Sequence, residues 1–135
     1  MKKQFLSFLM MAVLCSGTFA QSLFVGSYNL RCPNSNDDKN GNGWSTRGES
    51  ACKLMNFEQP DVFGTQELTI GQIRDVLKYM PDYKYIGVAR DDGKEKGEYA
   101  AIFYNVNKIK LLREGNFWLN ETPDVPKKGW DAACV

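Results

Sequence analysis

The spacing of hydrophobic positions changes along this chain, and in its first half the spacing predicts strands alternating with helices. Residues from Ser22 to Leu30 alternate between two faces, which predicts a strand. A second strand is predicted from Asp61 to Glu67, because Pro60 ends the helical pattern before it and the run contains Val62 and Phe63. The apolar and small residues of this run suit a strand that is covered on both faces.

Helical spacing follows each of these strands. Thr46 and Glu49 form a capping-box pattern that predicts a helix to about Gln59. Thr69 and Gln72 repeat the pattern and predict a second helix, which the next proline ends. The apolar residues expected on the inner faces are Ala51, Cys52, Leu54 and Met55 in the first helix, and Ile70, Ile73, Val76, Leu77 and Met80 in the second.

The second half of the chain has the character of strands. Strands are predicted from Tyr83 to Arg90 and from Tyr99 to Asn105, with two shorter candidates from Ile109 to Arg113 and from Asn116 to Leu119. The segment from Cys32 to Trp44 is rich in Asn, Asp and Gly. It lacks the alternation and final glutamate of an EF-hand, so we expect a surface loop rather than a calcium site. The order of elements predicts a mixed layered domain of strands and helices.

The N-terminus has the pattern of a secretory signal. Two lysines precede an apolar run from Phe5 to Cys15, and small residues lead to Ala20. The run is too short for a comfortable membrane span. A lipid anchor on Cys15 is disfavoured because the bulky Leu14 precedes it. We therefore expect cleavage after Ala20, no stable membrane anchor, and export to the periplasm or the medium.

The charge and the composition of the chain exclude some classes of function. Without the two lysines of the signal segment, 15 of the 17 basic residues remain against 16 acidic residues, which gives a net charge of −1. This balance gives no broad basic surface for binding nucleic acid or an anionic membrane. The chain contains no histidine, so Ser-His, Cys-His and His-metal sites are excluded from it.

Three cysteines remain after the signal segment, and the sequence leaves two interpretations open. An exported protein can form disulfides, and Cys32 with Cys52 is the nearest pair in sequence. The alternative is that the cysteines are small buried hydrophobic residues. Their spacing does not match a zinc site.

Two strand ends carry the candidate chemistry. Glu67 follows an apolar strand, where a carboxylate is costly unless a cation or hydrogen-bond donors receive it. The alternative is that Glu67 points into solvent near the start of the next helix, where negative charge is favoured. A second polar strand end, which contains Asn29, favours the first interpretation.

Five motifs in order connect the chain to a known family. They are Ser27-Tyr-Asn-Leu-Arg31, Pro60-Asp-Val-Phe-Gly-Thr-Gln-Glu67, Gly97-Glu-Tyr-Ala-Ala-Ile-Phe-Tyr104, Phe117-Trp-Leu-Asn-Glu-Thr-Pro123 and Gly129-Trp-Asp-Ala-Ala133. In this set the chain resembles the endonuclease/exonuclease/phosphatase superfamily, and its secreted bacterial members in particular. The resemblance covers residues 21–135 and implies an α+β fold, a four-layer αββα sandwich, of which this chain covers roughly the N-terminal half.

The resemblance also implies Mg²⁺-dependent hydrolysis of a phosphate ester, with Mn²⁺ as an alternative ion. It assigns Asn29 and Glu67 to the metal site, Asn29 also to the catalytic residues, and Glu98 to the orientation of a catalytic histidine. Arg90 is the candidate substrate-binding residue, because its fork of donors suits a phosphate. For Arg90 and Glu98 the alternative is an exposed charge on a hairpin. The tryptophans are expected to pack against the sandwich rather than stack on a substrate. They are Trp44, Trp118 and Trp130.

The family's histidine, its Asp-x-Asn segment and its late Asp-His pair have no counterpart before Val135. The last residues have the pattern of an opening strand, so we expect an N-terminal part of a longer protein, inactive and poorly folded alone. A phosphodiester is the expected substrate class, with nucleic acid, a phospholipid head group and a sugar phosphate all open. The alternative function is a non-catalytic module that binds a glycan or a protein partner on the same sandwich.

Overall fold

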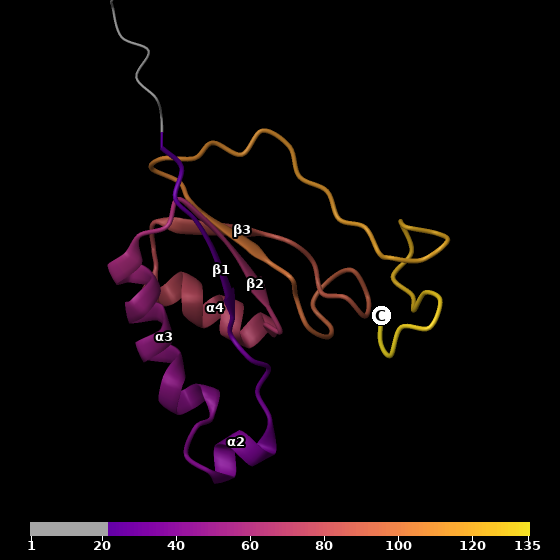
Figure 1. Cartoon of the computed structure of the whole chain (residues 1–135), viewed down its shortest axis with the longest axis horizontal. Coiled ribbons are helices and arrows are strands. Elements are labelled where there is room, and N and C mark those ends of the chain that lie inside the picture. Colours follow the sequence, from indigo (N-terminus) through magenta and orange to yellow (C-terminus); the bar gives the residue numbers. More distant parts are fainter. Residues whose placement is uncertain (1–21) are drawn as a thin grey trace, which may run out of the picture.

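The computed structural model describes residues 22–135, and its centre is a four-stranded sheet (Figure 1). The strands are β1 (Val25–Asn29), β2 (Val62–Gln66), β3 (Tyr83–Ile86) and β4 (Ile102–Asn105), in the spatial order β1-β2-β4-β3. β1 and β2 are parallel, whereas β4 is antiparallel to both β2 and β3. The parallel pair is possible because a helix connects its strands.

Two helices, α3 (Trp44–Glu58) and α4 (Ile70–Tyr79), cover one face of the sheet (Figure 1). Their buried residues form a single core with the inward side chains of the strands. Phe63 of β2 and Phe103 of β4 lie at its centre, stacked with ring centroids 5.0 Å apart. On the other face Val25 is 59% exposed and Ile102 is 41% exposed. The described residues therefore form one sheet and one helical layer of the expected α+β sandwich.

The helix predictions are confirmed for α4 and corrected in detail for α3. In α4 the Oε1 atom of Gln72 accepts a hydrogen bond from the Thr69 backbone N–H at 2.9 Å, as the capping box requires. α3 begins before the predicted Thr46, because the Gly43 carbonyl already accepts the N–H of Thr46 at 3.0 Å. Leu54 is 49% exposed, so its prediction as an inner residue is wrong. The buried positions of α3 lie on a different face of the helix.

The predicted surface loop between β1 and α3 contains a short helix, α2 (Ser35–Lys39). The Asn34 side chain accepts a hydrogen bond from the Asp37 N–H at 2.9 Å and caps this turn. The prediction of a plain loop is therefore wrong for these residues, although none of the residues of α2 is buried. Local capping by asparagine is enough to close one helical turn at the surface.

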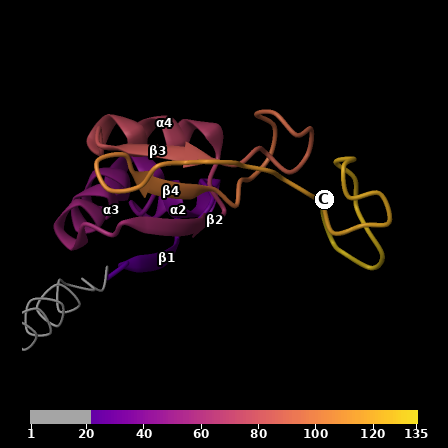
Figure 2. The same ribbon diagram turned by 90° about the horizontal axis from the view of Figure 1, so that it is seen from above.

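The strand predictions in the second half are too long or wrong. β3 ends at Ile86 because Gly87 turns the chain at φ 127°, and Tyr99 makes only an isolated bridge to Leu68. The candidates at 109–113 and 116–119 form no strand in the structure. In Figure 1 the chain that follows β4 runs outside the sheet, and in Figure 2 the last residues of the chain lie to one side of the sheet. With no neighbouring strand, the backbone groups of these segments have no ladder to join.

The Cys32–Cys52 disulfide is not present, because both residues are free thiols. Cys52 is fully buried in the helical layer, as the alternative interpretation predicted. Within residues 22–135 no helix is long and apolar enough to cross a membrane. The predicted signal segment at 1–20 lies outside the described residues.

Candidate active site

The parallel pairing of β1 and β2 brings the two predicted metal-site residues together. Asn29, the last residue of β1, pairs with Gln66, the last residue of β2. Asn29 and Glu67, the residue after Gln66, therefore lie at the same edge of the sheet. The Asn29 Nδ2 atom donates to Glu67 Oε1 at 2.7 Å. Glu67 takes a left-handed backbone conformation with φ 64°, which turns the chain away from the strand direction. The two polar strand ends of the sequence thus form one cluster.

Two backbone N–H groups complete this cluster. The Arg31 N–H donates to Asn29 Oδ1 at 2.8 Å, and the Cys32 N–H donates to Glu67 Oε2 at 3.2 Å. The hydrogen bonds from Asn29 and then from Cys32 lower the pKa of Glu67, since they favour the charged form of its carboxyl group. Glu67 is therefore an anion at neutral pH.

The cluster fits a magnesium ion that keeps most of its water. Each oxygen of the Glu67 carboxylate accepts one hydrogen bond, which leaves lone pairs free for a cation. Mg²⁺ binds well to one or two carboxylates plus water and substrate oxygens. Among residues 22–135 no group of three or more His, Cys, Asp or Glu side chains forms a complete metal cage. Asn29, with its Nδ2 on Glu67 and its Oδ1 on a peptide N–H, holds the carboxylate in this arrangement.

The predicted residues Arg90 and Glu98 meet in the segment between β3 and β4. The Arg90 Nη1 atom and Glu98 Oε2 are 3.0 Å apart, and the Arg90 N–H donates to the Glu98 carbonyl at 3.0 Å. Their side chains are 34% and 28% exposed, so they are half-buried rather than free hairpin charges. The buried Arg90 Nε atom has no hydrogen-bond partner. It is the one such side-chain atom found in residues 22–135.

Glu67, Arg90 and Glu98 line the wall of one cavity, and Asn29 contacts Glu67. All four predicted site residues therefore belong to one region of the molecule. The Cys32 backbone N–H also contacts Glu67 in this region. Burial, and after it the Glu98 and Glu67 carboxylates, raise the pKa of the Cys32 thiol.

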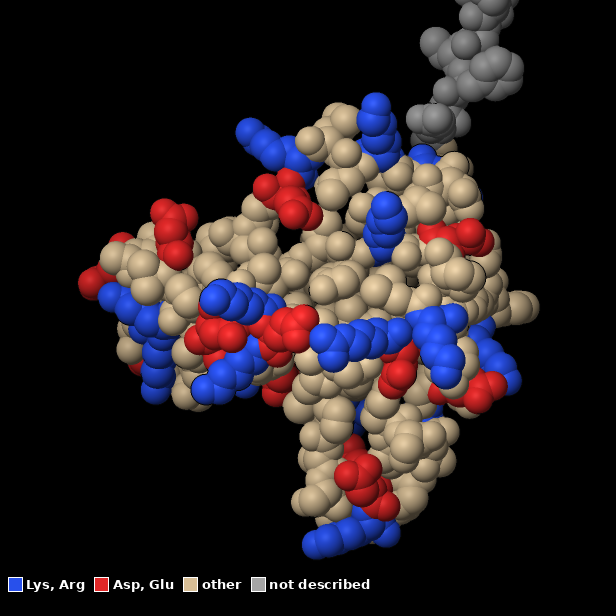
Figure 3. All heavy atoms as spheres, turned by 180° about the vertical axis from the view of Figure 1, so that it is seen from behind, with Lys and Arg blue, Asp and Glu red and all other residues tan. Residues whose placement is uncertain are grey.

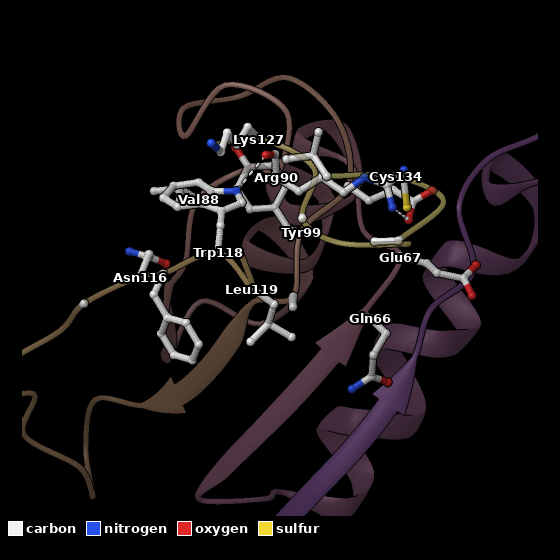
Figure 4. A pocket seen from close by; sticks show the side chains of 17 residues that line it. Gln66, Glu67, Val88, Arg90, Tyr99, Asn116, Trp118, Leu119, Lys127 and Cys134 are labelled. Carbon is white, nitrogen blue, oxygen red and sulfur yellow. Dashed lines mark hydrogen bonds and ion pairs between the residues drawn. The ribbon is translucent and has the colours of Figure 1, made fainter. Parts of the chain in front are cut away.

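A cavity of about 610 Å³ lies beside this region (Figure 4). Figure 4 shows Glu67 on one side of the group of side chains and Asn116 on the other. Trp118 lies half-buried in its wall, where its Nε1–H donates to the Arg90 carbonyl at 2.8 Å. Trp118 thus anchors Arg90, and Trp44 packs against the core, in agreement with the expected packing role. Trp130 is 72% exposed, so the expectation of packing is wrong for this residue.

The surface charges are mixed in sign on the face of the molecule shown in Figure 3. Lys and Arg lie there among Asp and Glu, without a continuous basic stripe. Among the described residues several charged side chains form ion pairs, such as Arg74 with Glu95 at 3.0 Å. This face gives no electrostatic surface suited to a nucleic-acid backbone.

The sequence did not reveal the two peptide N–H groups of the site. Every residue carries such a group, and only the backbone conformation decides where it points. Arg31 has φ 55°, an unusual value for a residue other than glycine. A polar residue such as Arg31, two positions after the end of a strand, is too common in sequences to predict a left-handed backbone conformation.

The comparison with known proteins agrees with this geometry. No family model matches the chain. An endonuclease/exonuclease/phosphatase family protein of Bacteroides thetaiotaomicron is 49% identical and superimposes with a TM-score of 0.82, over 84% of this chain and 42% of that protein. A structure of a mannosyl-6-phosphatase of Bacteroides thetaiotaomicron is 50% identical, with the same TM-score and coverage.

An endonuclease/exonuclease/phosphatase protein of Bacteroides vulgatus is 38% identical, with a TM-score of 0.81 over 86% of this chain and 44% of that protein. The chain therefore spans less than half the length of these relatives. This chain belongs to the endonuclease/exonuclease/phosphatase family.

Proposed function

We propose that the protein is a Mg²⁺-dependent phosphoesterase whose metal is held by Glu67, with Mn²⁺ as the alternative ion. The observation that carries this proposal is the Asn29–Glu67 pair, which fixes an ionised carboxylate at the end of two parallel strands. When bound there, the ion supplies charge stabilisation to a phosphoryl oxygen and to the leaving oxygen. Asn29 and the Cys32 N–H orient the Glu67 carboxylate for that ion.

Arg90 is the proposed phosphate-binding residue. Its Nη1 atom is held by Glu98 at 3.0 Å, and its buried Nε lies 3.5 Å from an Asp91 carboxylate oxygen without a hydrogen bond. The guanidinium has more donors than these contacts use, and such a fork of donors suits a phosphate. In this role Glu98 keeps the guanidinium in place. Because Glu98 lines the same cavity as Glu67, it is also the proposed residue that orients a further catalytic side chain. Trp118 fixes the backbone of Arg90 through its carbonyl.

The proposed substrate class is a phosphorylated sugar. The supporting observation is the 50% identity with a mannosyl-6-phosphatase, together with a cavity whose wall contains both Arg90 and aromatic side chains. The sequence alone favoured a phosphodiester, and the two classes make different predictions. A monoester releases inorganic phosphate in one step, whereas a diester releases an alcohol and leaves a monoester.

The test is hydrolysis by the purified full-length protein in a Mg²⁺ series, with EDTA as the metal-free control. We expect release of inorganic phosphate from mannose 6-phosphate that depends on the metal. Metal-dependent cleavage of bis-p-nitrophenyl phosphate without release from the sugar phosphate would instead favour the diester. Absence of both activities, with binding of a glycan or protein partner, would support the non-catalytic module and refute the proposal.

We further propose that the protein acts outside the cytoplasm, because residues 1–20 have the pattern of a signal segment. Mass spectrometry of protein recovered from the periplasm or medium should give a chain that starts at Gln21. A mature chain that starts at a lipidated Cys15 would contradict this and place the protein on a membrane.

A further inference from the structure

The turn that follows β1 is held from the core side by two side chains, Arg47 and Gln72. Arg47, in the first turns of α3, donates from Nη1 to the Leu30 carbonyl and from Nη2 to the Arg31 carbonyl, each at 2.7 Å. Gln72, in the first turn of α4, donates from Nε2 to the Arg31 carbonyl at 3.0 Å. Two helices thus converge on two consecutive carbonyl groups.

These carbonyl groups belong to the same peptide units as the N–H groups of the site. The Leu30 carbonyl shares its peptide with the Arg31 N–H, which donates to Asn29. The Arg31 carbonyl shares its peptide with the Cys32 N–H, which donates to Glu67. The peptide bonds of the described residues are all trans. In a trans peptide the C=O and N–H bonds point in opposite directions, so a carbonyl fixed toward the helices aims its N–H toward the site.

We propose that Arg47 and Gln72 are positioning residues, which orient the two peptides of the Leu30–Cys32 turn so that their N–H groups hold Asn29 and Glu67 for the metal ion. This inference rests on the proposed function, since it assigns the support of the same site. Both side chains hydrogen-bond to the backbone of the turn and not to the side chains of Asn29 or Glu67. Both act through the backbone of the turn.

The two side chains are built to be rigid. Gln72 is 1% exposed, and its Oε1 atom accepts the Thr69 N–H, so its amide cannot rotate without loss of the helix cap. Arg47 is fixed at a third point, because its Nε donates to the Asn42 carbonyl at 3.2 Å. Its guanidinium carbon also lies 5.2 Å from the centre of the Trp44 ring. Rigid support is needed because Arg31 has a left-handed backbone conformation that a free turn would rarely adopt.

The bidentate geometry explains why an arginine is needed here. One guanidinium can donate to two neighbouring carbonyls at once, whereas the single ammonium of a lysine cannot hold both in the same directions. Arg47→Lys therefore keeps the charge and most of the volume of the side chain but loses one of the two contacts. Arg74→Lys is the matched control, because Arg74 lies on α4 and makes an exposed ion pair with Glu95, away from the turn.

The experiment measures Mn²⁺ binding to the full-length protein by calorimetry, and amide hydrogen exchange at Arg31 and Cys32 by NMR. In Arg47→Lys we expect Mn²⁺ affinity to fall by about 10- to 100-fold, the usual effect of losing support for a metal ligand. The amides of Arg31 and Cys32 should exchange faster, while that of Phe63 in the core stays protected. Arg74→Lys should match the wild type in both measurements.

Gln72→Met is the second variant, and it should show the same two changes. If Arg47→Lys keeps wild-type Mn²⁺ affinity and wild-type hydrogen exchange at both amides, the proposal is overturned. A lowered melting temperature alone would then show that Arg47 is a purely structural residue. If the wild-type protein binds no Mn²⁺, the proposed function fails. The exchange measurement still decides whether Arg47 and Gln72 orient the turn.

Discussion

Replacing Glu67 by glutamine removes the negative charge of the side chain and nearly preserves its size and shape. The Asn29 Nδ2 and the Cys32 N–H both donate to the carboxylate. Glutamine offers a single oxygen to these two donors, so one of them must face its amide nitrogen. The variant therefore loses the anion and also one of the two contacts that hold the side chain in place.

The expected effect on activity is large because no neighbouring carboxylate replaces the lost charge. Glu98 is already paired with Arg90 at 3.0 Å. Removal of a single electrostatic contact to a transition state costs about 10²- to 10³-fold in kcat, and the loss of the metal's anionic ligand should cost at least this much. Since a hard cation with few protein ligands binds more weakly to an amide, part of the activity should return as Mg²⁺ is raised.

The assay is steady-state release of inorganic phosphate from mannose 6-phosphate by the full-length protein, over a Mg²⁺ series. Glu49→Gln is the matched control, because Glu49 lies on the exposed face of α3 and pairs only with Lys53 at 2.7 Å. A Glu67→Gln enzyme with wild-type turnover and wild-type metal dependence would refute the assignment of Glu67 as the metal ligand. A loss of activity together with a loss of the cooperative folding transition would refute the claim that the change acts on the site alone.

Two further predictions concern the fold around the site. The Asp61 carboxylate accepts hydrogen bonds from Lys108 Nζ at 2.6 Å and from the Phe24 N–H at 2.8 Å, and the Lys108 contact is the main cause that lowers its pKa. A lowered pKa means that the contribution of Asp61 to stability is present above its unfolded pKa of about 3.9 and is lost as the pH falls through the folded value. Urea unfolding should therefore show that Asp61→Asn destabilises the protein at pH 7 and much less below pH 3, whereas an equal effect at both pH values would contradict this account. Burial raises the pKa of the Cys52 thiol to about 11. In the native protein a maleimide should therefore label the exposed Cys134 and should label Cys52 only after unfolding, which peptide mapping can check. Rapid labelling of Cys52 in the native protein would show that the core opens.

The local elements near the site were within reach of the sequence. The apolar run of β2 and the capping box of α4 depend on neighbouring residues, so their pattern is complete within about ten positions of the chain. The position of Glu67 just after an apolar strand was informative for the same reason. The start of α3 was misplaced because the Gly43 backbone, rather than a side-chain cap, receives its first turn.

The failed strand predictions at 109–113 and 116–119 show the opposite case. Their alternation suited a strand, but strand formation needs a partner, and the partner is a property of the whole fold. The free state of Cys32 and Cys52 has a similar cause. Sequence proximity made them a candidate pair, whereas the helix places Cys52 in the core and the turn places Cys32 beside the site.

The sequence by itself determined the candidate site residues, because Asn29 and Glu67 stand at the ends of recognisable strands. Only the tertiary structure decided how they work together. The parallel register of β1 and β2 places the two side chains 2.7 Å apart, and Arg47 and Gln72 reach the intervening turn from two different helices. These contacts join residues 16 to 41 positions apart. Contacts at such distances depend on how the helices pack on the sheet, and that packing is a property of the assembled core rather than of any single segment.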